Sequence, residues 1–178
     1  MILGVDFSIT GTGLAILGDN GATDTCTIKP PKDDGTVQSI AERLTFIADK
    51  AEAWSDLARG DFLVFESPLH HAPSAHRGKI LGGWWITAAR LARAVNDSAL
   101  VVSPKTRAKY ATGNGNADKK AVLEQVRARY PQFVVRNDNE ADAVALVAIA
   151  ARMLGRPIDP DLPETNLSAL QALNKENQ

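Results

Sequence analysis

Short apolar runs separated by turn residues predict five β-strands. The run TGLAIL follows ILGVD after the turn-rich SITG, which is typical of a β-hairpin. The continuous apolar run FLVF favours a central strand with both faces buried. The expected strands are residues 2–6, 12–17, 22–29, 62–65 and 99–103.

Apolar residues that recur at helical spacing predict four main helices. Gly155 and Pro157 end the last of these, and Asp118 lies near the start of the one before it. Between the fourth strand and the second helix, residues 67–78 contain two prolines and a glycine, so we expect a loop there. The expected helices are residues 37–57, residues 79–95, the segment after the turn TGNGNAD, and residues 139–154.

Three successive strands followed by strand and helix alternation predict an α/β fold, in which helices flank a mixed sheet. The length of 178 residues, with 44% apolar and 23% charged residues, is typical of one compact domain. We place this domain at residues 1–155. Residues 156–178 are rich in proline and then polar, so we expect a C-terminal tail that is either disordered or a short helix near 167–174.

The chain has one cysteine, Cys26, which excludes an internal disulfide and a cysteine-based zinc cluster. The start MILGVDFS lacks the basic and apolar regions of a signal peptide, and no run of about 18 apolar residues occurs. We therefore expect a cytoplasmic protein with no membrane partner.

Three carboxylates lie where a sequence that only stabilises a fold would rarely place them. Asp6 and Glu66 each end an apolar strand, and Asp142 interrupts an Ala/Val/Leu helix. If the first and fourth strands are parallel neighbours, the three acids meet at one sheet edge. Clustered carboxylates repel unless a cation neutralises them, and oxygen ligands suit Mg²⁺ or Mn²⁺. Any one of these acids alone is more typical of a turn or a cap.

The net charge of −1 hides an uneven distribution. Residues 67–129 carry eleven Lys and Arg against three acids, a net +8, whereas residues 1–66 carry −6 and residues 130–178 carry −3. A basic middle third between acidic segments suits a nuclease, because metals act on the scissile phosphate while Lys and Arg bind the flanking backbone. A solvated basic surface is the ordinary alternative.

Two further groups have less specific signals. The three histidines at positions 70, 71 and 76 have spacings unlike a structural zinc site, so we favour groove or base contacts. Trp84 and Trp85 cannot both face one core, because adjacent helical residues point about 100° apart. We expect one to pack inward and the other to lie at a subunit interface.

Five motifs together resemble the RuvC-type Holliday junction resolvases of the RNase H-like (retroviral integrase) superfamily, including its phage-type members. The resemblance covers residues 1–154, and the fourth motif is the most specific, because its spacing is long and ordered. The motifs are ILGVDFSITGTGLAI, VFES, LGG, VSPKTRAKYATGNGNADKKAVLEQV and NEADAVALVAIA.

The resemblance implies an RNase H-like five-stranded sheet, two Mg²⁺ ions per site with Mn²⁺ as a substitute, and a homodimer. It implies that Asp6, Glu66 and Asp142 bind metal and that Lys119 lies near the scissile phosphate. The family's fourth ligand, Asp or His, falls on Asn139, which could coordinate through its carbonyl oxygen, with Asp138 as a substitute.

A second family lysine falls on Ala108, and we expect Lys109 to replace it. The family aromatic that probes the junction is absent, with Leu69 and His70 in that region. The candidate DNA contacts are therefore Leu69, His70, Arg77, Lys79, Lys105, Arg107, Lys109, Lys119 and Lys120.

The function we expect is Mg²⁺-dependent hydrolysis of four-way and other branched DNA in recombination and repair, leaving 5′-phosphate and 3′-hydroxyl ends. One alternative is a catalytically weakened branched-DNA-binding module on the same fold, and another is an RNA-processing RNase H-like nuclease. The start DFSITGTG also suits an actin-like or sugar-kinase ATPase, but that architecture needs two such lobes, and the chain is too short for them.

Overall fold

The computed structural model describes residues 1–68, 74–95, 99–159 and 161–176. Its five strands form one sheet in the order β3-β2-β1-β4-β5. The first two pairings, β1 with β2 and β2 with β3, are antiparallel, while β4 is parallel to both β1 and β5. The predicted mixed five-stranded sheet is confirmed. The strands are β1 (Ile2–Asp6), β2 (Thr12–Leu17), β3 (Thr23–Ile28), β4 (Phe62–Glu66) and β5 (Ala99–Val102).

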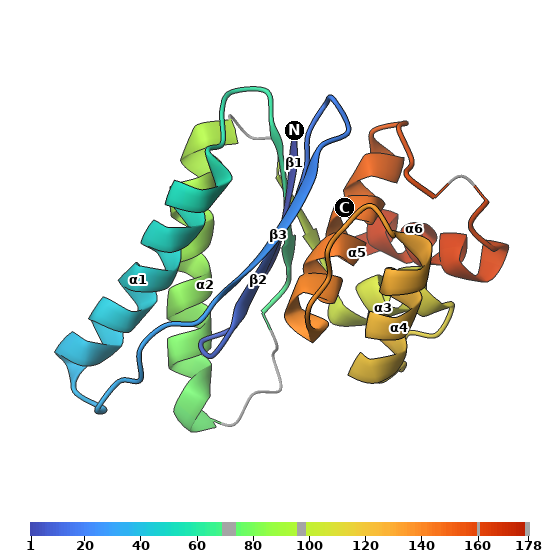
Figure 1. Cartoon of the computed structure of the whole chain (residues 1–178). Coiled ribbons are helices and arrows are strands. Elements are labelled where there is room, and N and C mark those ends of the chain that lie inside the picture. The colour runs from blue at the N-terminus through green and yellow to red at the C-terminus, as the bar shows by residue number, and fades with distance from the viewer. Residues whose placement is uncertain (69–73, 96–98, 160, 177–178) are drawn as a thin grey trace.

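Helices cover both faces of the sheet (Figure 1). One face carries α1 (Val37–Ser55) and α2 (Ser74–Val95). The other carries α5 (Asp138–Met153), with three shorter helices around it: α3 (Pro104–Thr112), α4 (Lys119–Arg129) and α6 (Glu164–Glu176). None of the helices in the described part of the chain combines the length and apolar composition needed to cross a membrane.

Alternation along β1 divides its side chains between two cores. Leu3 and Val5 belong to the core under α1 and α2, whereas Ile2 belongs to the core around α5. Every residue of α5 from Glu140 to Ala151 is buried, which explains its nearly continuous Ala, Val and Leu sequence. An acid inside this helix is therefore held rigidly against the sheet.

One expected helix start is wrong, and one helix is not among the expected ones. The helix α2 begins at Ser74 rather than Lys79, and Gly78, which has open space around it, is accommodated within the helix. The unexpected helix is α3, although its sequence carries clear end signals. Ser103 accepts a hydrogen bond from the Thr106 backbone N–H, Pro104 is the first residue, and Gly113 ends the helix at φ 82°.

The segment expected as a tail contains α6, which packs against α3 (Figure 1). Leu162, Ala169 and Leu173 are buried in the same core as α5, and Asn166 donates a hydrogen bond of 2.8 Å to the Tyr110 carbonyl. The domain boundary at residue 155 stays a prediction, but the described part of this segment shares the core of the preceding residues.

Candidate active site

The parallel pairing of β1 and β4 brings two of the predicted acids together. The register pairs Val5 with Phe65, so the next residues, Asp6 and Glu66, end adjacent strands at the same edge of the sheet. Glu66 is buried, and its backbone carbonyl accepts a hydrogen bond of 2.8 Å from the Trp84 indole. The expectation that one of the two tryptophans packs inward is confirmed, because Trp84 is buried while Trp85 is 64% exposed; the expected interface stays a prediction.

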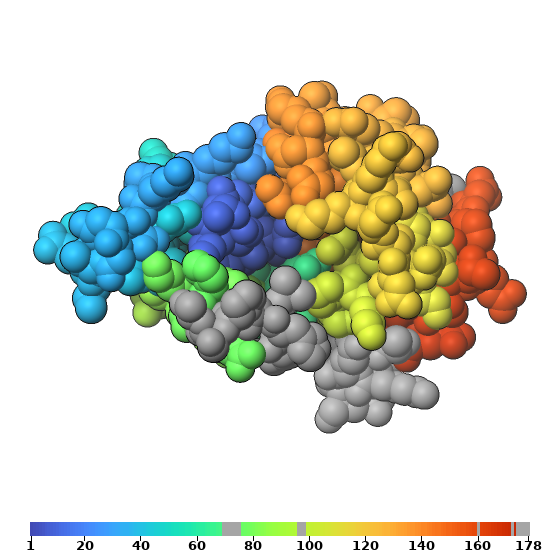
Figure 2. All heavy atoms as spheres, turned by 90° about the horizontal axis from the view of Figure 1, so that it is seen from below, coloured from blue at the N-terminus to red at the C-terminus, as the bar shows by residue number. Residues whose placement is uncertain are grey.

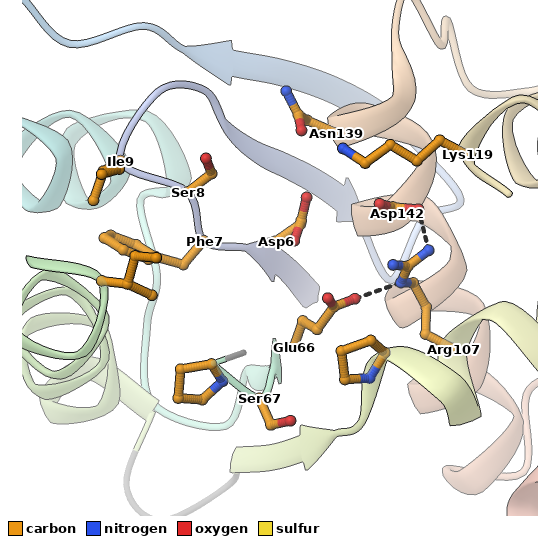
Figure 3. Close-up of a pocket in the computed structure, with 13 residues that line it drawn as sticks. Asp6, Phe7, Ser8, Ile9, Glu66, Ser67, Arg107, Lys119, Asn139 and Asp142 are labelled. Carbon is orange, nitrogen blue, oxygen red and sulfur yellow. Dashed lines mark hydrogen bonds and ion pairs between the residues drawn. The ribbon is translucent and has the colours of Figure 1, made fainter. Parts of the chain in front are cut away.

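Helix α5 supplies the third acid to the same place. Asn137 caps this helix by accepting a hydrogen bond from the Glu140 backbone N–H. Asn139 and Asp142 are then separated by about one turn and share a face. The predicted meeting of Asp6, Glu66 and Asp142 is confirmed, since all three line one cavity of about 310 Å³ together with Asn139 (Figure 3).

Charged, polar and apolar side chains all line the cavity. Its two basic residues, Arg107 and Lys119, come from α3 and α4 and lie beside the acids (Figure 3). The N-terminal segment, dark blue, reaches the molecular surface between segments of α2, α3, α4 and α5 in the space-filling view (Figure 2), with the partly exposed residues that follow the buried strand β1. The remaining lining residues are Phe7, Ser8, Ile9, Ser67, Pro68, Ile80 and Pro104.

Arg107 is the cation that contacts the acids of this cavity directly. Its Nε donates to Glu66 and its guanidinium also binds Asp142, so one side chain bridges two of the three acids (Figure 3). Its side chain is 10% exposed. Burial by itself would lower the pKa of Arg107, but the charges of Glu66 and Asp142 outweigh burial and raise that pKa above its ordinary value.

The three acids are out of water and close to one another, which perturbs their protonation. Burial raises the pKa of Asp6 well above its ordinary value, and the charges of Glu66 and Asp142 raise it further. Burial raises the pKa of Asp142 to about 7, although Arg107 opposes this shift. The site thus disfavours the fully ionised state of its own carboxylates.

Lys119 and Asp138 form an ion pair at the rim, with 2.7 Å between Nζ and Oδ2. This hydrogen bond raises the pKa of Lys119 and lowers that of Asp138. Asn139 lines the cavity, whereas Asp138 is not among its lining residues and is paired with Lys119. Of the two candidates for a fourth ligand, the geometry therefore favours Asn139.

The expectation that Lys109 replaces the second family lysine stays a prediction. Lys109 lies in a separate hollow with Lys105, Gly115 and Asn116, and Ala108 is buried. Arg107 instead reaches the acidic cavity. From the sequence, Arg107 is expected only among the DNA contacts, because without helix α3 the direction in which its side chain points is undetermined. The helix-start signal at Ser103 and Pro104 could have revealed α3.

The other candidate DNA contacts are scattered. Lys79 forms an ion pair of 2.7 Å with Asp33, which also binds Arg43 at 3.0 Å. Arg77 and Lys120 are exposed, and Lys120 lies 3.9 Å from Glu124. Leu69 and His70 lie outside the described residues, as does His71.

The donor set can be compared with what a metal needs. Carboxylate and amide oxygens suit a hard divalent cation such as Mg²⁺ or Mn²⁺. Within the described part of the chain, no three acidic, histidine or cysteine side chains already stand as a metal-binding group. The residues therefore fit such an ion in their chemistry, and all of them line one cavity, but with Arg107 engaging two of the acids they do not form a ready metal site.

Comparison with known proteins agrees with this architecture. The chain is 33% identical over 153 residues to the crossover junction endodeoxyribonuclease RuvC of Nocardia farcinica, a match that spans 82% of this chain and 77% of that protein. It is 31% identical over 153 residues to the RuvC of a Mycobacterium species, covering 79% of it. No protein-family model matches the chain.

Solved structures show the same fold at low sequence identity. The Thermus thermophilus RuvC structure superposes with a TM-score of 0.55 at 17% identity, covering 87% of this chain and 96% of that one. The yeast mitochondrial Holliday junction resolvase Ydc2 gives a TM-score of 0.55 at 13% identity, covering 97% and 84%.

Sheet order and helix placement thus define an RNase H-like α/β protein with an acidic cavity at one sheet edge. Within that class, the sequence identity over most of both chains assigns this chain to the RuvC family.

Proposed function

We propose that this protein is a divalent-metal-dependent endonuclease that resolves four-way DNA junctions, and acts on other branched DNA, by phosphodiester hydrolysis. The observation that carries the proposal is the convergence of Asp6, Glu66 and Asp142 in one cavity beside Arg107 and Lys119. It is supported by membership of a family whose relatives are named crossover junction endodeoxyribonucleases. Another T. thermophilus RuvC structure is described as a complex with a Holliday junction substrate.

In this proposal Asp6, Glu66, Asp142 and the Asn139 carbonyl would hold two Mg²⁺ or Mn²⁺ ions. When bound, such ions would supply an activated water and neutralise charge on the leaving oxygen, and the expected products are 5′-phosphate and 3′-hydroxyl ends. Glu66 and Asp142 are held rigidly by their buried positions on β4 and α5. Rigid placement matters because catalysis depends on holding the reacting groups in one geometry.

Lys119 and Arg107 have different roles in this proposal. The Lys119 side chain is 72% exposed at the rim, so its ammonium is accessible to a backbone phosphate. Arg107 is buried among the acids and offers a planar guanidinium where negative charge gathers. Both are proposed to stabilise the phosphate during cleavage, with Lys105, Lys109 and Lys120 contacting the DNA backbone farther out.

Resolution of a four-way junction requires two symmetric cuts, which a two-fold homodimer provides by directing two sites at one substrate. Trp85 of α2 is 64% exposed, and the adjacent Ile86 is 37% exposed. These side chains suit a subunit interface, where tryptophan is enriched. We place the site of action in the cytosol of a bacterium or of a phage-infected host.

The decisive experiment is cleavage of duplex, flap, fork and four-way-junction DNA with Mg²⁺ and, as a non-supporting control ion, Ca²⁺. We expect Mg²⁺-dependent cutting of the junction in preference to the duplex. Asp6→Asn and Asp142→Asn should each abolish cutting while retaining junction binding, and Asp161→Asn, an exposed acid, is the matched control. Wild-type cutting by both site variants would show that the acids are not catalytic.

One alternative has an observation in its favour. Asn139 stands where the resemblance places a fourth acidic or histidine ligand, and Arg107 engages two of the remaining three acids. These features suit a weakened enzyme that binds branched DNA without cutting it. Junction binding with no nicking in either Mg²⁺ or Mn²⁺ would favour that module over the nuclease.

A further inference from the structure

We infer that Arg107 is a built-in counter-cation of the acidic cavity, which holds Glu66 and Asp142 in the metal-free protein and competes with divalent cations for them. The inference rests on the proposed function, because it takes these two acids to be metal ligands. It adds a residue that controls when the metal binds.

The position of Arg107 is fixed by the helix that carries it. Ser103 and Pro104 set the start of α3, and its residues Ala108, Tyr110 and Ala111 are buried in the core. The side chain of Arg107 therefore leaves α3 toward the cavity, where it is 10% exposed and bridges acids from β4 and α5 (Figure 3).

The guanidinium of Arg107 and a metal ion would compete for the negative charge of the same two carboxylates. Nε of Arg107 binds Oε2 of Glu66, and Nη1 binds Oδ1 of Asp142. A cation held by those carboxylates would lie within a few ångströms of the guanidinium carbon. Each acid has a second oxygen outside these two hydrogen bonds, but like charges at that separation in a buried cavity repel strongly, so we expect metal entry to displace Arg107 from at least one acid.

Arginine is suited to this role in a way that lysine is not. Its planar fork donates to two carboxylates at once, whereas a lysine ammonium is a point charge. In the absence of metal, Arg107 offsets part of the repulsion among Asp6, Glu66 and Asp142. The cost of displacing it sets a threshold concentration of divalent cation for loading the site.

Calorimetric titration of the full chain with Mn²⁺ tests the inference without measuring cleavage. We expect Arg107→Gln to bind Mn²⁺ about tenfold more tightly than the wild type, because the competing charge is gone. Arg107→Lys should fall between them, since lysine can hold one acid but not both. Lys109→Gln, which removes a positive charge from the same helix outside the cavity, is the matched control and should change the affinity less than about twofold.

Thermal unfolding separates this role from simple structural support. In EDTA, Arg107→Gln should unfold at a lower temperature than the wild type, because Glu66 and Asp142 have lost their ion-pair partner. Excess Mn²⁺ should then raise its Tm by more than it raises that of the wild type. An equal loss of stability with and without Mn²⁺ would mean that Arg107 is structural, and would overturn the inference.

A measurement on the wild-type protein covers the case in which Arg107→Gln does not fold. The Nε–H resonance of Arg107 in ¹⁵N-labelled protein should shift on titration with diamagnetic Ca²⁺. An unchanged resonance at saturating Ca²⁺ would overturn the inference.

Asp6→Asn distinguishes the two levels of proposal. If Asp6→Asn loses Mn²⁺ binding while Arg107→Gln binds like the wild type, the metal site is correct and the role of Arg107 is wrong. If Asp6→Asn binds Mn²⁺ as well as the wild type does, or if neither the wild type nor Arg107→Gln binds it, both proposals fail.

Discussion

Two glycines on the sheet let α5 come close enough to bring its polar residues to the strand ends. A Cβ at Gly4 would lie 2.4 Å from the Ala143 carbonyl oxygen, and one at Gly13 would lie 2.0 Å from that of Asn139. Both neighbours are backbone atoms of a buried helix, so they cannot move aside cheaply. The glycines therefore set the depth at which Asn139 and Asp142 enter the cavity.

Gly13→Ala should damage both the fold and the site. The added methyl has to push back the first turn of α5, and overpacking of this kind costs about 3 kcal/mol. We expect a lower urea midpoint and a loss of junction cleavage, measured on the same preparation. Gly78→Ala is the control, because Gly78 lies in α2 with open space around it and alanine should stabilise that helix by about 0.5–1 kcal/mol. Equal stability of Gly13→Ala and the wild type would contradict the close approach.

Asn139→Asp should turn the cavity into one with four carboxylates. The added charge lies beside Asp6 and Asp142, so we expect Mn²⁺ affinity to rise about tenfold and stability in EDTA to fall. Calorimetry and thermal unfolding measure the two effects. Asn116→Asp makes the same chemical change at an exposed position outside this cavity and should leave the affinity unchanged. A variant that binds Mn²⁺ no better than the wild type would place Asn139 outside the ligand set.

At the scale of single residues, the sequence identifies site residues where a charged side chain occupies a position that the pattern predicts to be buried. Asp6, Glu66 and Asp142 were identifiable because acids at the ends of buried strands, or inside an apolar helix, need a reason. Arg107 was not identifiable as a partner of these acids. The direction in which a helical side chain points can be predicted only when the helix itself is predicted, and α3 is not among the predicted helices.

The buried carboxylate of Asp159 connects several helices. It accepts hydrogen bonds from the hydroxyls of Tyr110 and Tyr130, and it forms an ion pair of 2.8 Å with Arg152. Burial and the charge of Asp159 raise the pKa of both tyrosines. One side chain thus ties α3, the end of α4 and the end of α5 to the segment that leads into α6.

Asp159→Asn should loosen this junction of helices. It removes the charge that faces Arg152 in a site where the Asp159 side chain is 2% exposed, so we expect a loss of about 3 kcal/mol in the free energy of unfolding. Urea denaturation followed by circular dichroism measures it, and Asp161→Asn, two residues on and exposed, should change stability by less than about 0.5 kcal/mol. Equal losses in the two variants would mean that the network contributes nothing specific.

Strands were easier to predict than helix ends. The hairpin of β1 and β2 was correct at both ends, because its apolar runs are bounded by turn residues. The helix α3 escaped notice because residues 104–112 are mostly polar, and Gly78 suggested a loop although α2 continues through it. Tertiary packing, which a local pattern does not contain, decides such cases.

For the whole molecule, the net charge of +8 on residues 67–129 overstates the surface that can contact DNA. Several of these cations are engaged within the protein. Lys79 pairs with Asp33, Arg90 with Asp49 and Glu52, and Arg107 with the cavity acids. The hydrogen bond from Lys79 lowers the pKa of Asp33, as expected for a carboxylate that faces a cation. Lys105, by contrast, is exposed and forms no ion pair with any described residue.

The salt dependence of junction binding should distinguish these two kinds of lysine. Each phosphate contact made by a cation contributes about 0.9 to the slope of log affinity against log salt concentration. Lys105→Gln should therefore lower the slope by about that amount, whereas Lys79→Gln should change it little, because Lys79 is already neutralised by Asp33. Fluorescence anisotropy of a labelled four-way junction in Ca²⁺ measures binding without cutting. A slope that falls equally in both variants would mean that DNA takes Lys79 from Asp33. A slope that falls in neither would place this part of the basic segment away from the DNA.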